Sequence, residues 1–217
     1  MNIIILGSQG SGKGTQAEML AKKYDLEHID MGKTLRSVAK QDTPLGREIY
    51  SIQNVTKTLV PSRILREVMH LEIGSLERER GIVFDGVPRT MDQAEYLEGA
   101  LQEFGRKLDK VFFINISKEE SSKRISARWS CSACNKSLIM GRDIQNAYDV
   151  CPMCKGKIAQ RIDDTQEGIE KRLKVFQAET LPVIEYFKTK GVLVEIDGAQ
   201  PAEKVFAEII ENLRDIV

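Results

Sequence analysis

The chain has 217 residues, of which 41% are hydrophobic and 29% are charged, and this composition suits one compact α/β domain with room for an insertion. Its 32 basic and 32 acidic side chains balance, which argues against a protein that binds nucleic acid or an anionic membrane over a wide surface. The apolar start is too short for a signal peptide, and no later apolar run approaches membrane-spanning length. We therefore expect a soluble, cytoplasmic protein.

A glycine-rich turn follows the first apolar stretch, residues 2–6, and leads into helix-forming sequence. Such a turn lets successive backbone N–H groups face one concavity, to which the dipole of the next helix adds partial positive charge. A nucleotide phosphate fits there, whereas a tight connection without a ligand is the alternative. The pattern departs from the common phosphate loop, because a glycine stands where Ser or Thr is usual. The residues expected around the phosphates are Gly10, Ser11, Gly12, Lys13, Gly14 and Thr15.

Strand and helix patterns alternate along the rest of the chain. The short apolar runs are typical of parallel strands covered on both faces, and they predict a doubly wound, three-layer α/β fold of the P-loop NTPase type with a five-stranded parallel sheet. In the helix expected from Pro61 to about Glu79, Ile64, Val68 and Leu71 should be buried. Further strands are expected at 26–29, 82–84, 111–114 and 192–196, and further helices at 16–24, 31–40, 45–52, 92–104, 118–129, 165–188 and 202–213.

Two stretches fall outside this alternation. Residues 31–60 form a small helical insert, and residues 129–160 form a polar insert that carries the cysteines. The core would then consist of residues 1–30, 61–128 and 161–217. Ligands of such sheets lie at the carboxyl ends of the strands, so both inserts would flank the phosphate loop.

The four cysteines are two C-x-x-C pairs, Cys131 with Cys134 and Cys151 with Cys154, separated by sixteen residues. This spacing fits a structural four-thiolate zinc site, in which each pair supplies two sulfur atoms from one tight turn. The insert has too few large apolar residues for a core of its own, so metal binding would supply its folding free energy. A redox pair, free thiols and a zinc ribbon that contacts nucleic acid are the alternatives, and scarce aromatic residues and little excess positive charge count against the last.

Acidic and basic residues gather near the expected strand ends and around the cysteine insert. Asp85 follows a strand, so it can hold Mg²⁺ directly or through water, together with Thr15. Arg124 and Arg128 are four residues apart and would share one face of a helix. Scattered surface arginines are the alternative interpretation. The arginines expected to surround a transferring phosphoryl group are Arg89, Arg124, Arg128, Arg161 and Arg172.

Taken in order, these motifs resemble the nucleoside monophosphate kinase family, adenylate kinases above all. The phosphate loop reads GxxGxGKGT, residues 85–93 resemble DGFPRT-x-x-Q, and residues 57–61 resemble G-x-LVP. Residues 161–164 match R-x-DD, and Asp197-Gly198 matches the segment beside the triphosphate base. The resemblance covers the whole length and corresponds to the form with a long, zinc-binding lid.

The resemblance implies reversible transfer of the γ-phosphoryl group from Mg·ATP to AMP, giving two ADP, by a monomer with structural Zn²⁺ and no nucleic acid or membrane partner. It makes 31–60 the insert that binds the nucleoside monophosphate (NMP) and 129–160 the lid. Catalysis would rest on Lys13, Arg89, Arg124, Arg128, Arg161 and Arg172. ATP would bind the phosphate loop, Arg124, Arg128 and Gln200. The monophosphate would bind Met31, Arg36, Thr58, Leu59, Val60, Gly86, Arg89, Gln93, Arg161 and Arg172.

Lys57 stands where the family usually has a glycine, and two further positions depart from the family pattern. Met31 stands where a threonine helps to hold adenine, and Lys33 replaces an acidic residue that helps to place the waters of magnesium. A kinase with a broadened or different choice of base therefore remains open, as does a P-loop ATPase or switch with a zinc ribbon. The second of these predicts a basic face and hydrolysis stimulated by a partner.

Overall fold

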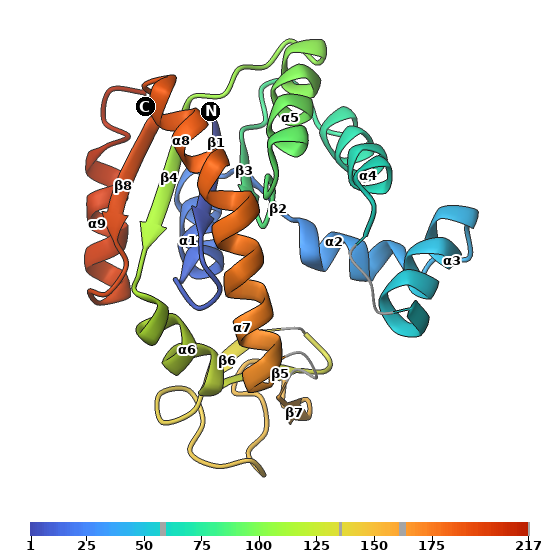
Figure 1. Cartoon of the computed structure of the whole chain (residues 1–217), viewed down its shortest axis with the longest axis vertical. Coiled ribbons are helices and arrows are strands. Elements are labelled where there is room, and N and C mark those ends of the chain that lie inside the picture. Colours follow the sequence, from blue (N-terminus) through green and yellow to red (C-terminus); the bar gives the residue numbers. More distant parts are fainter. Residues whose placement is uncertain (57–59, 135, 161–163, 217) are drawn as a thin grey trace.

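The computed structural model describes residues 1–56, 60–134, 136–160 and 164–216 (Figure 1). Thr58, Leu59 and Arg161, to which the sequence assigns binding roles, lie outside the described residues, as do Lys57 and Asp163.

The predicted five-stranded parallel sheet is confirmed. Its order is β2-β3-β1-β4-β8, and every neighbouring pair is parallel. Gly7, Asp30, Asp85 and Asn115 all stand at carboxyl ends of strands, and Asp30 lies beside Asp85 in the register. The strands are β1 (Asn2–Gly7), β2 (Glu27–Asp30), β3 (Ile82–Asp85), β4 (Lys110–Asn115) and β8 (Leu193–Asp197).

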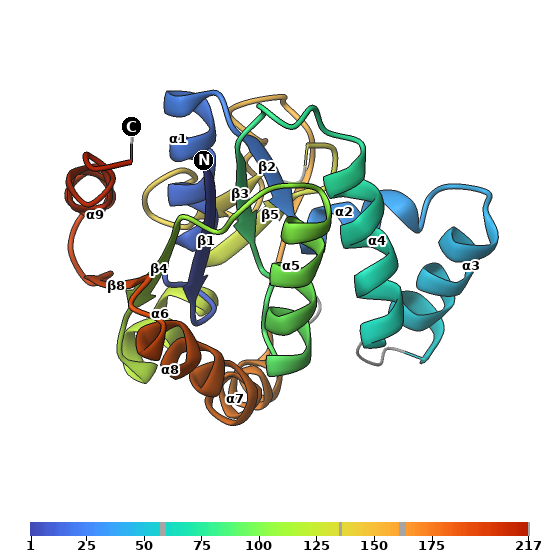
Figure 2. The same cartoon turned by 90° about the horizontal axis from the view of Figure 1, so that it is seen from above.

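Helices cover both faces of this sheet (Figure 2). Ile3 and Ile5 of β1 pack with residues of α1 (Lys13–Tyr24) and α9 (Ala202–Glu211). Ile4 and Leu6 point to the other face, where α4 (Ser62–Gly74), α5 (Met91–Glu103) and α8 (Leu181–Thr189) lie. Since successive side chains of a strand alternate between faces, an unbroken apolar strand supplies both cores.

Helix α4 is shorter than predicted. It ends at Gly74 rather than near Glu79, and Leu71 is 60% exposed, so its expected burial is wrong. The buried positions are Ile64, Val68, Met69 and Ile73. Leu71 and Ile73 lie on nearly opposite sides of the helix, and the packed side runs from Ile64 through Val68 and Met69 to Ile73, so it is rotated away from the predicted one.

The region predicted as one helix from 118 to 129 divides in two. Helix α6 (Lys118–Ser126) ends at the Ala127 cap, and β5 (Arg128–Cys131) begins the cysteine insert. Trp129 pairs with Leu138 of β6 (Ser137–Ile139), and Cys131 pairs with Ile158 of β7 (Ile158–Ala159). Pairing within this small antiparallel sheet overrides the helical pattern, so the predicted common helical face for Arg124 and Arg128 is wrong.

The long C-terminal helical region contains an irregularity. Helix α7 (Gln166–Val175) passes through a π-helical segment, η2 (Phe176–Thr180), into α8. Pro182 stands at the start of α8, where its missing N–H is tolerated. The remaining helical elements lie in the insert at the right of Figure 1: α2 (Met31–Val38), α3 (Pro44–Tyr50) and η1 (Ser51–Thr56).

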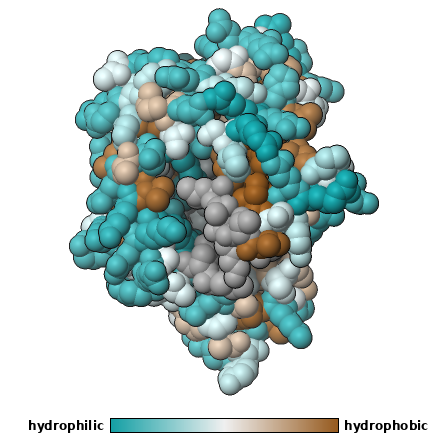
Figure 3. Space-filling model, turned by 45° about the vertical axis from the view of Figure 1, so that its right-hand side comes forward, coloured by the Kyte–Doolittle hydropathy of each residue, from teal (hydrophilic) through white to brown (hydrophobic). Residues whose placement is uncertain are grey.

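The cysteine insert lies at the lower end of Figure 1, below α6 and α7. The face that Figure 3 turns forward is mostly hydrophilic, with hydrophobic side chains in a few places. Among the described residues, no helix is both long and apolar enough to span a bilayer.

Candidate active site

The phosphate loop, residues 7–15, joins β1 to α1. Gly10 and Gly12 have φ values of 81° and 93°, which side-chain-bearing residues rarely adopt, and Gly12 caps α1 without a side chain. A Cβ atom on Gly7 would lie 2.8 Å from the backbone oxygen of Ile114, so the loop also depends on close backbone packing. The N-terminal amides of α1 are thereby left open to an anion.

Lys13 and Asp85 interact electrostatically beside this loop. Burial lowers the pKa of Lys13, an effect that the charge of Asp85 partly offsets. Burial also opposes ionisation of Asp85, but His28 and the charge of Lys13 outweigh it and hold the pKa of Asp85 below its ordinary value. His28 Nε2 lies 3.8 Å from Asp85 Oδ2. The charges of Lys13 and Asp85 therefore favour each other beside the loop.

Gly14 explains the departure from the common loop pattern. A Cβ atom at this position would lie 3.0 Å from Asp85 Oδ2, so glycine lets the carboxylate approach the first turn of α1. Asp85 Oδ1 is buried and receives no hydrogen bond from the described residues. A free carboxylate oxygen beside a phosphate site fits Mg²⁺, which binds few protein carboxylates and keeps several waters. Thr15 is exposed on the same turn.

Asp164 joins two of the predicted arginines. Arg128 donates to it twice, through Nε at 2.9 Å and Nη2 at 2.6 Å, and Arg172 donates through Nη2 at 2.7 Å. The Asp164 side chain is only 2% exposed. Burial opposes its ionisation, but the two guanidinium groups outweigh this effect and lower the pKa of Asp164. Arg128 and Arg172 thus form one unit although they lie on β5 and α7.

Arg124 lies apart from that unit. Its Nε donates to Glu120 at 2.6 Å, and its two terminal nitrogens lie 3.5 Å from the backbone oxygens of Gly10 and Ala199. Arg124 therefore bridges the phosphate loop and the loop after β8. Gln200, predicted to bind ATP, donates from Nε2 to Glu208 at 2.7 Å.

The residues predicted to bind the monophosphate comprise polar side chains near the strand ends and apolar side chains that contact the main core. Arg89 follows β3; its Nε donates to the backbone oxygen of Gly86 at 2.8 Å, and its backbone N–H donates to Gln93 Oε1 at 2.8 Å. Arg36 folds back over Gly32, where a Cβ atom would lie 3.3 Å from its Nη1. Met31 is 2% exposed and belongs to the main core, so its side chain packs inward. Val60 also contacts this core.

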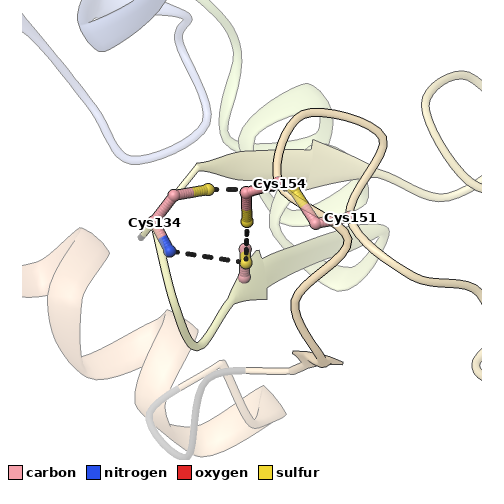
Figure 4. A group of neighbouring side chains, drawn as sticks. Cys134, Cys151 and Cys154 are labelled. Carbon is pink, nitrogen blue, oxygen red and sulfur yellow. Dashed lines mark hydrogen bonds between the residues drawn. The ribbon is translucent and has the colours of Figure 1, made fainter.

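The four cysteine sulfur atoms lie within 4.8 Å of one another. Figure 4 shows the side chains of Cys134, Cys151 and Cys154 turned toward a common point. The sulfur atoms of Cys131 and Cys154 are 3.4 Å apart, and those of Cys134 and Cys151 are 3.7 Å apart. Tetrahedral zinc with its usual bond lengths requires sulfur separations of about 3.8 Å. The cluster therefore fits the predicted zinc site.

Backbone groups shape this cluster as well. The N–H of Cys134 approaches the sulfur atom of Cys131 at 3.5 Å and lowers the pKa of Cys131 to about 6. The amide of Gly156 acts in the same direction on Cys154, but the neighbouring sulfur atoms outweigh it and raise the pKa of Cys154 to about 12. One thiolate is thus favoured while further ionisation is opposed by repulsion, which a divalent cation would remove.

Two residues near the phosphate site were not singled out from the sequence as binding residues. Asp164 belongs to the R-x-DD segment, which offered a signal for its role, but His28 offered none. A histidine within a short strand resembles any half-buried residue until the sheet places it beside Asp85.

Comparison with known proteins gives matches over almost the whole length of the chain. The sequence profile of the family described as adenylate kinase matches residues 5–192. A protein named adenylate kinase from Brevibacillus brevis is 38% identical over 214 residues, which are 99% of this chain and 100% of that protein. Proteins of the same name from Caldicellulosiruptor bescii (37% over 213 residues; 98% of this chain and 99% of that protein) and Syntrophomonas wolfei (35% over 216 residues; 100% of both) are similar throughout.

Proposed function

The chain belongs to the adenylate kinase family, and on this premise we propose that it transfers the γ-phosphoryl group of Mg·ATP reversibly to AMP, giving two ADP. It is a phosphotransferase of the nucleoside monophosphate kinase type. The observation that carries the proposal is the meeting of Lys13, Asp85 and Arg89 at the carboxyl ends of β1 and β3, next to amides left open for phosphate.

The proposed mechanism needs positive charge and positioning rather than a general base. Phosphoryl transfer spreads negative charge over the oxygens of the transferring group, and preorganised cations lower that barrier. Lys13 follows the migrating group, while Arg89 and Arg36 hold the acceptor phosphate. Arg124, Arg128, Arg161 and Arg172 surround the triphosphate.

Asp164 has a part in this arrangement. It accepts hydrogen bonds from both Arg128 and Arg172, so it keeps these two cations together despite their mutual repulsion. Held in this way, the two guanidinium groups can meet phosphate oxygens with little further ordering.

Asp85 and Thr15 are proposed to hold Mg²⁺ directly or through water. When bound, Mg²⁺ neutralises phosphate charge and orients the triphosphate. The four cysteines are proposed to hold a structural Zn²⁺, since four thiolates leave no open coordination position.

The two inserts are proposed to have separate functions. Residues 31–60 would bind AMP and residues 129–160 would act as the lid, each approaching the phosphate loop from its own side. Approach of both inserts would exclude water from the transferring group and so prevent hydrolysis of ATP.

AMP is favoured as the acceptor. The inward packing of Met31 supports this choice, because a side chain buried in the core does not loosen the base pocket. The relatives named adenylate kinase point the same way. Gln93 is proposed to read the base through the amide nitrogen that its bond to Arg89 leaves available.

A coupled assay tests the proposal directly. Mg²⁺ and ATP are offered with AMP, GMP, CMP or UMP in parallel, and ATP alone is the control. Rapid ADP formation with AMP only is expected. Comparable rates with several acceptors would assign a broader kinase, and hydrolysis of ATP without any transfer would contradict the proposed function.

A further inference from the structure

Helix α6 touches the phosphate loop at two successive residues. The hydroxyl of Ser121 donates to the backbone oxygen of Gln9 at 2.5 Å, across 112 positions of sequence, and Ser121 is completely buried. Gly10 lies tightly against this helix, since a Cβ atom there would lie 3.1 Å from the backbone oxygen of Ser121 and 3.3 Å from Cβ of Arg124. The loop therefore rests directly on α6.

The hydroxyl of Ser121 does not make the local bond that is common for serine in a helix. Serine hydroxyls there often bond to the carbonyl four residues earlier, and Ser126 of the same helix does so with Ser122 at 3.0 Å. Ser121 instead crosses to the loop. A fully buried hydroxyl is costly unless it is hydrogen-bonded, so its partner is a specific one.

This bond fixes more than one atom of the loop. In a planar trans peptide the carbonyl and the N–H point in opposite directions, so holding the oxygen of Gln9 against α6 turns the N–H of Gly10 away from the helix. Loop amides that face away from their support are the donors that bind a phosphate. We propose that Ser121 is a positioning residue for ATP, acting through the Gln9–Gly10 peptide. This inference rests on the proposed function, because it concerns the same nucleotide.

Arg124 cannot replace this anchor. Its contact with the oxygen of Gly10 is long, at 3.5 Å, and the proposed function requires its guanidinium to turn toward the triphosphate. The bond from Ser121 is short and involves no group that ATP needs. It therefore keeps the loop on α6 while Arg124 moves.

Ser121→Ala tests this role, with Ser126→Ala as the matched control on the same helix. The Kd of ATP is measured by calorimetry, and the KM values of ATP and AMP by the coupled assay. We expect Ser121→Ala to raise both the Kd and the KM of ATP about 5- to 10-fold and to leave the KM of AMP within about twofold. Cysteine is a weaker donor of similar size, so the ATP affinity of Ser121→Cys should fall between those of the wild type and Ser121→Ala. This variant gives the same comparison if Ser121→Ala does not fold.

Two results would overturn the inference. One is unchanged ATP affinity in Ser121→Ala. The other is an equal rise in the KM of ATP and AMP together with a large fall in the thermal midpoint, which would mean that Ser121 only stabilises the fold. The proposed function fails separately, because in that case the wild-type chain itself would not transfer phosphoryl to AMP.

Discussion

Asp164 accepts hydrogen bonds from Arg128 and Arg172, and the ionisation of its carboxyl group predicts how the stability of the protein depends on pH. Its pKa in the folded protein lies below the ordinary value, so its stabilising effect is complete above about pH 4 and is lost as the pH falls through the folded pKa. Asp164→Asn should therefore lower the thermal midpoint at pH 7, and this difference from the wild type should shrink as the pH falls below 4. Thermal unfolding between pH 7 and pH 3 measures it. A difference independent of pH would mean that the charge of Asp164 does not hold the pair.

Lys13 gives the clearest functional prediction for a single side chain. Lys13→Met removes the cation at the phosphate loop, and we expect the kcat to fall about 10²- to 10³-fold or more while the circular dichroism spectrum is retained. Lys22→Met, an exposed lysine of the same helix, is the control and should keep full activity. Near-normal turnover of the Lys13 variant would remove the role assigned to the loop.

Individual residues differ in how far the sequence predicts them. The phosphate loop was predictable because glycines and a lysine at fixed spacing have few other uses, and the cysteine pairs were predictable for the same reason. The inward packing of Met31 and the contact of His28 with Asp85 were not, because both depend on strands that are distant in sequence.

Arg106 binds the non-helical segment that follows α4, a contact that apolar periodicity could not show. Its guanidinium donates to the backbone oxygens of Leu76 and Glu77, at 3.3 and 2.6 Å, and of Arg80 at 2.6 Å. Arg106 is 8% exposed, so it satisfies these carbonyls in place of further helical turns. The continuation to Glu79 predicted from sequence was wrong because this partner comes from another element.

Arg106→Ala should accordingly destabilise the fold without touching the nucleotide site. Three carbonyls would lose their donor, and we expect the free energy of unfolding to fall by about 2–4 kcal/mol. Lys107→Ala removes an exposed neighbouring charge and is the control. Urea denaturation measures both variants. A loss below about 0.5 kcal/mol for Arg106→Ala would show that water replaces the guanidinium.

The cysteine insert is an element whose stability we expect to depend on metal. Its apolar cluster is small, consisting of Cys131, Leu138, Ile144 and Cys151 with partly buried neighbours. Replacing Cys131 and Cys134 by Ser should abolish bound zinc and lower the thermal midpoint, because zinc supplies about 10 kcal/mol in structural sites of this kind. Ser137→Ala on β6 is the control. Metal analysis of the purified proteins decides, since unchanged zinc content would exclude the four-thiolate site.

At the scale of the whole molecule, an ion pair joins the cysteine insert to the core. Lys136 Nζ lies 2.6 Å from Glu18 Oε2, which joins the insert to α1, the helix that begins at the phosphate loop. The sheet and its layers followed from the sequence, because apolar strands and crossover helices leave few arrangements. The contact between Lys136 and Glu18 could not be predicted from the sequence, because neither residue belongs to a motif.

Glu18→Gln should loosen the insert. The pair is partly exposed, so it contributes about 0.2–1 kcal/mol and is screened by salt. We expect faster hydrogen exchange of the β5 and β6 amides at low ionic strength, by up to about fivefold, and no difference from the wild type at about 1 M salt. Glu185→Gln removes a comparable exposed charge on α8 and should change nothing in the insert. If exchange in the insert is the same in both variants at low salt, the ion pair does not hold the insert to the core, and its position is set by the backbone connections through α6 and α7.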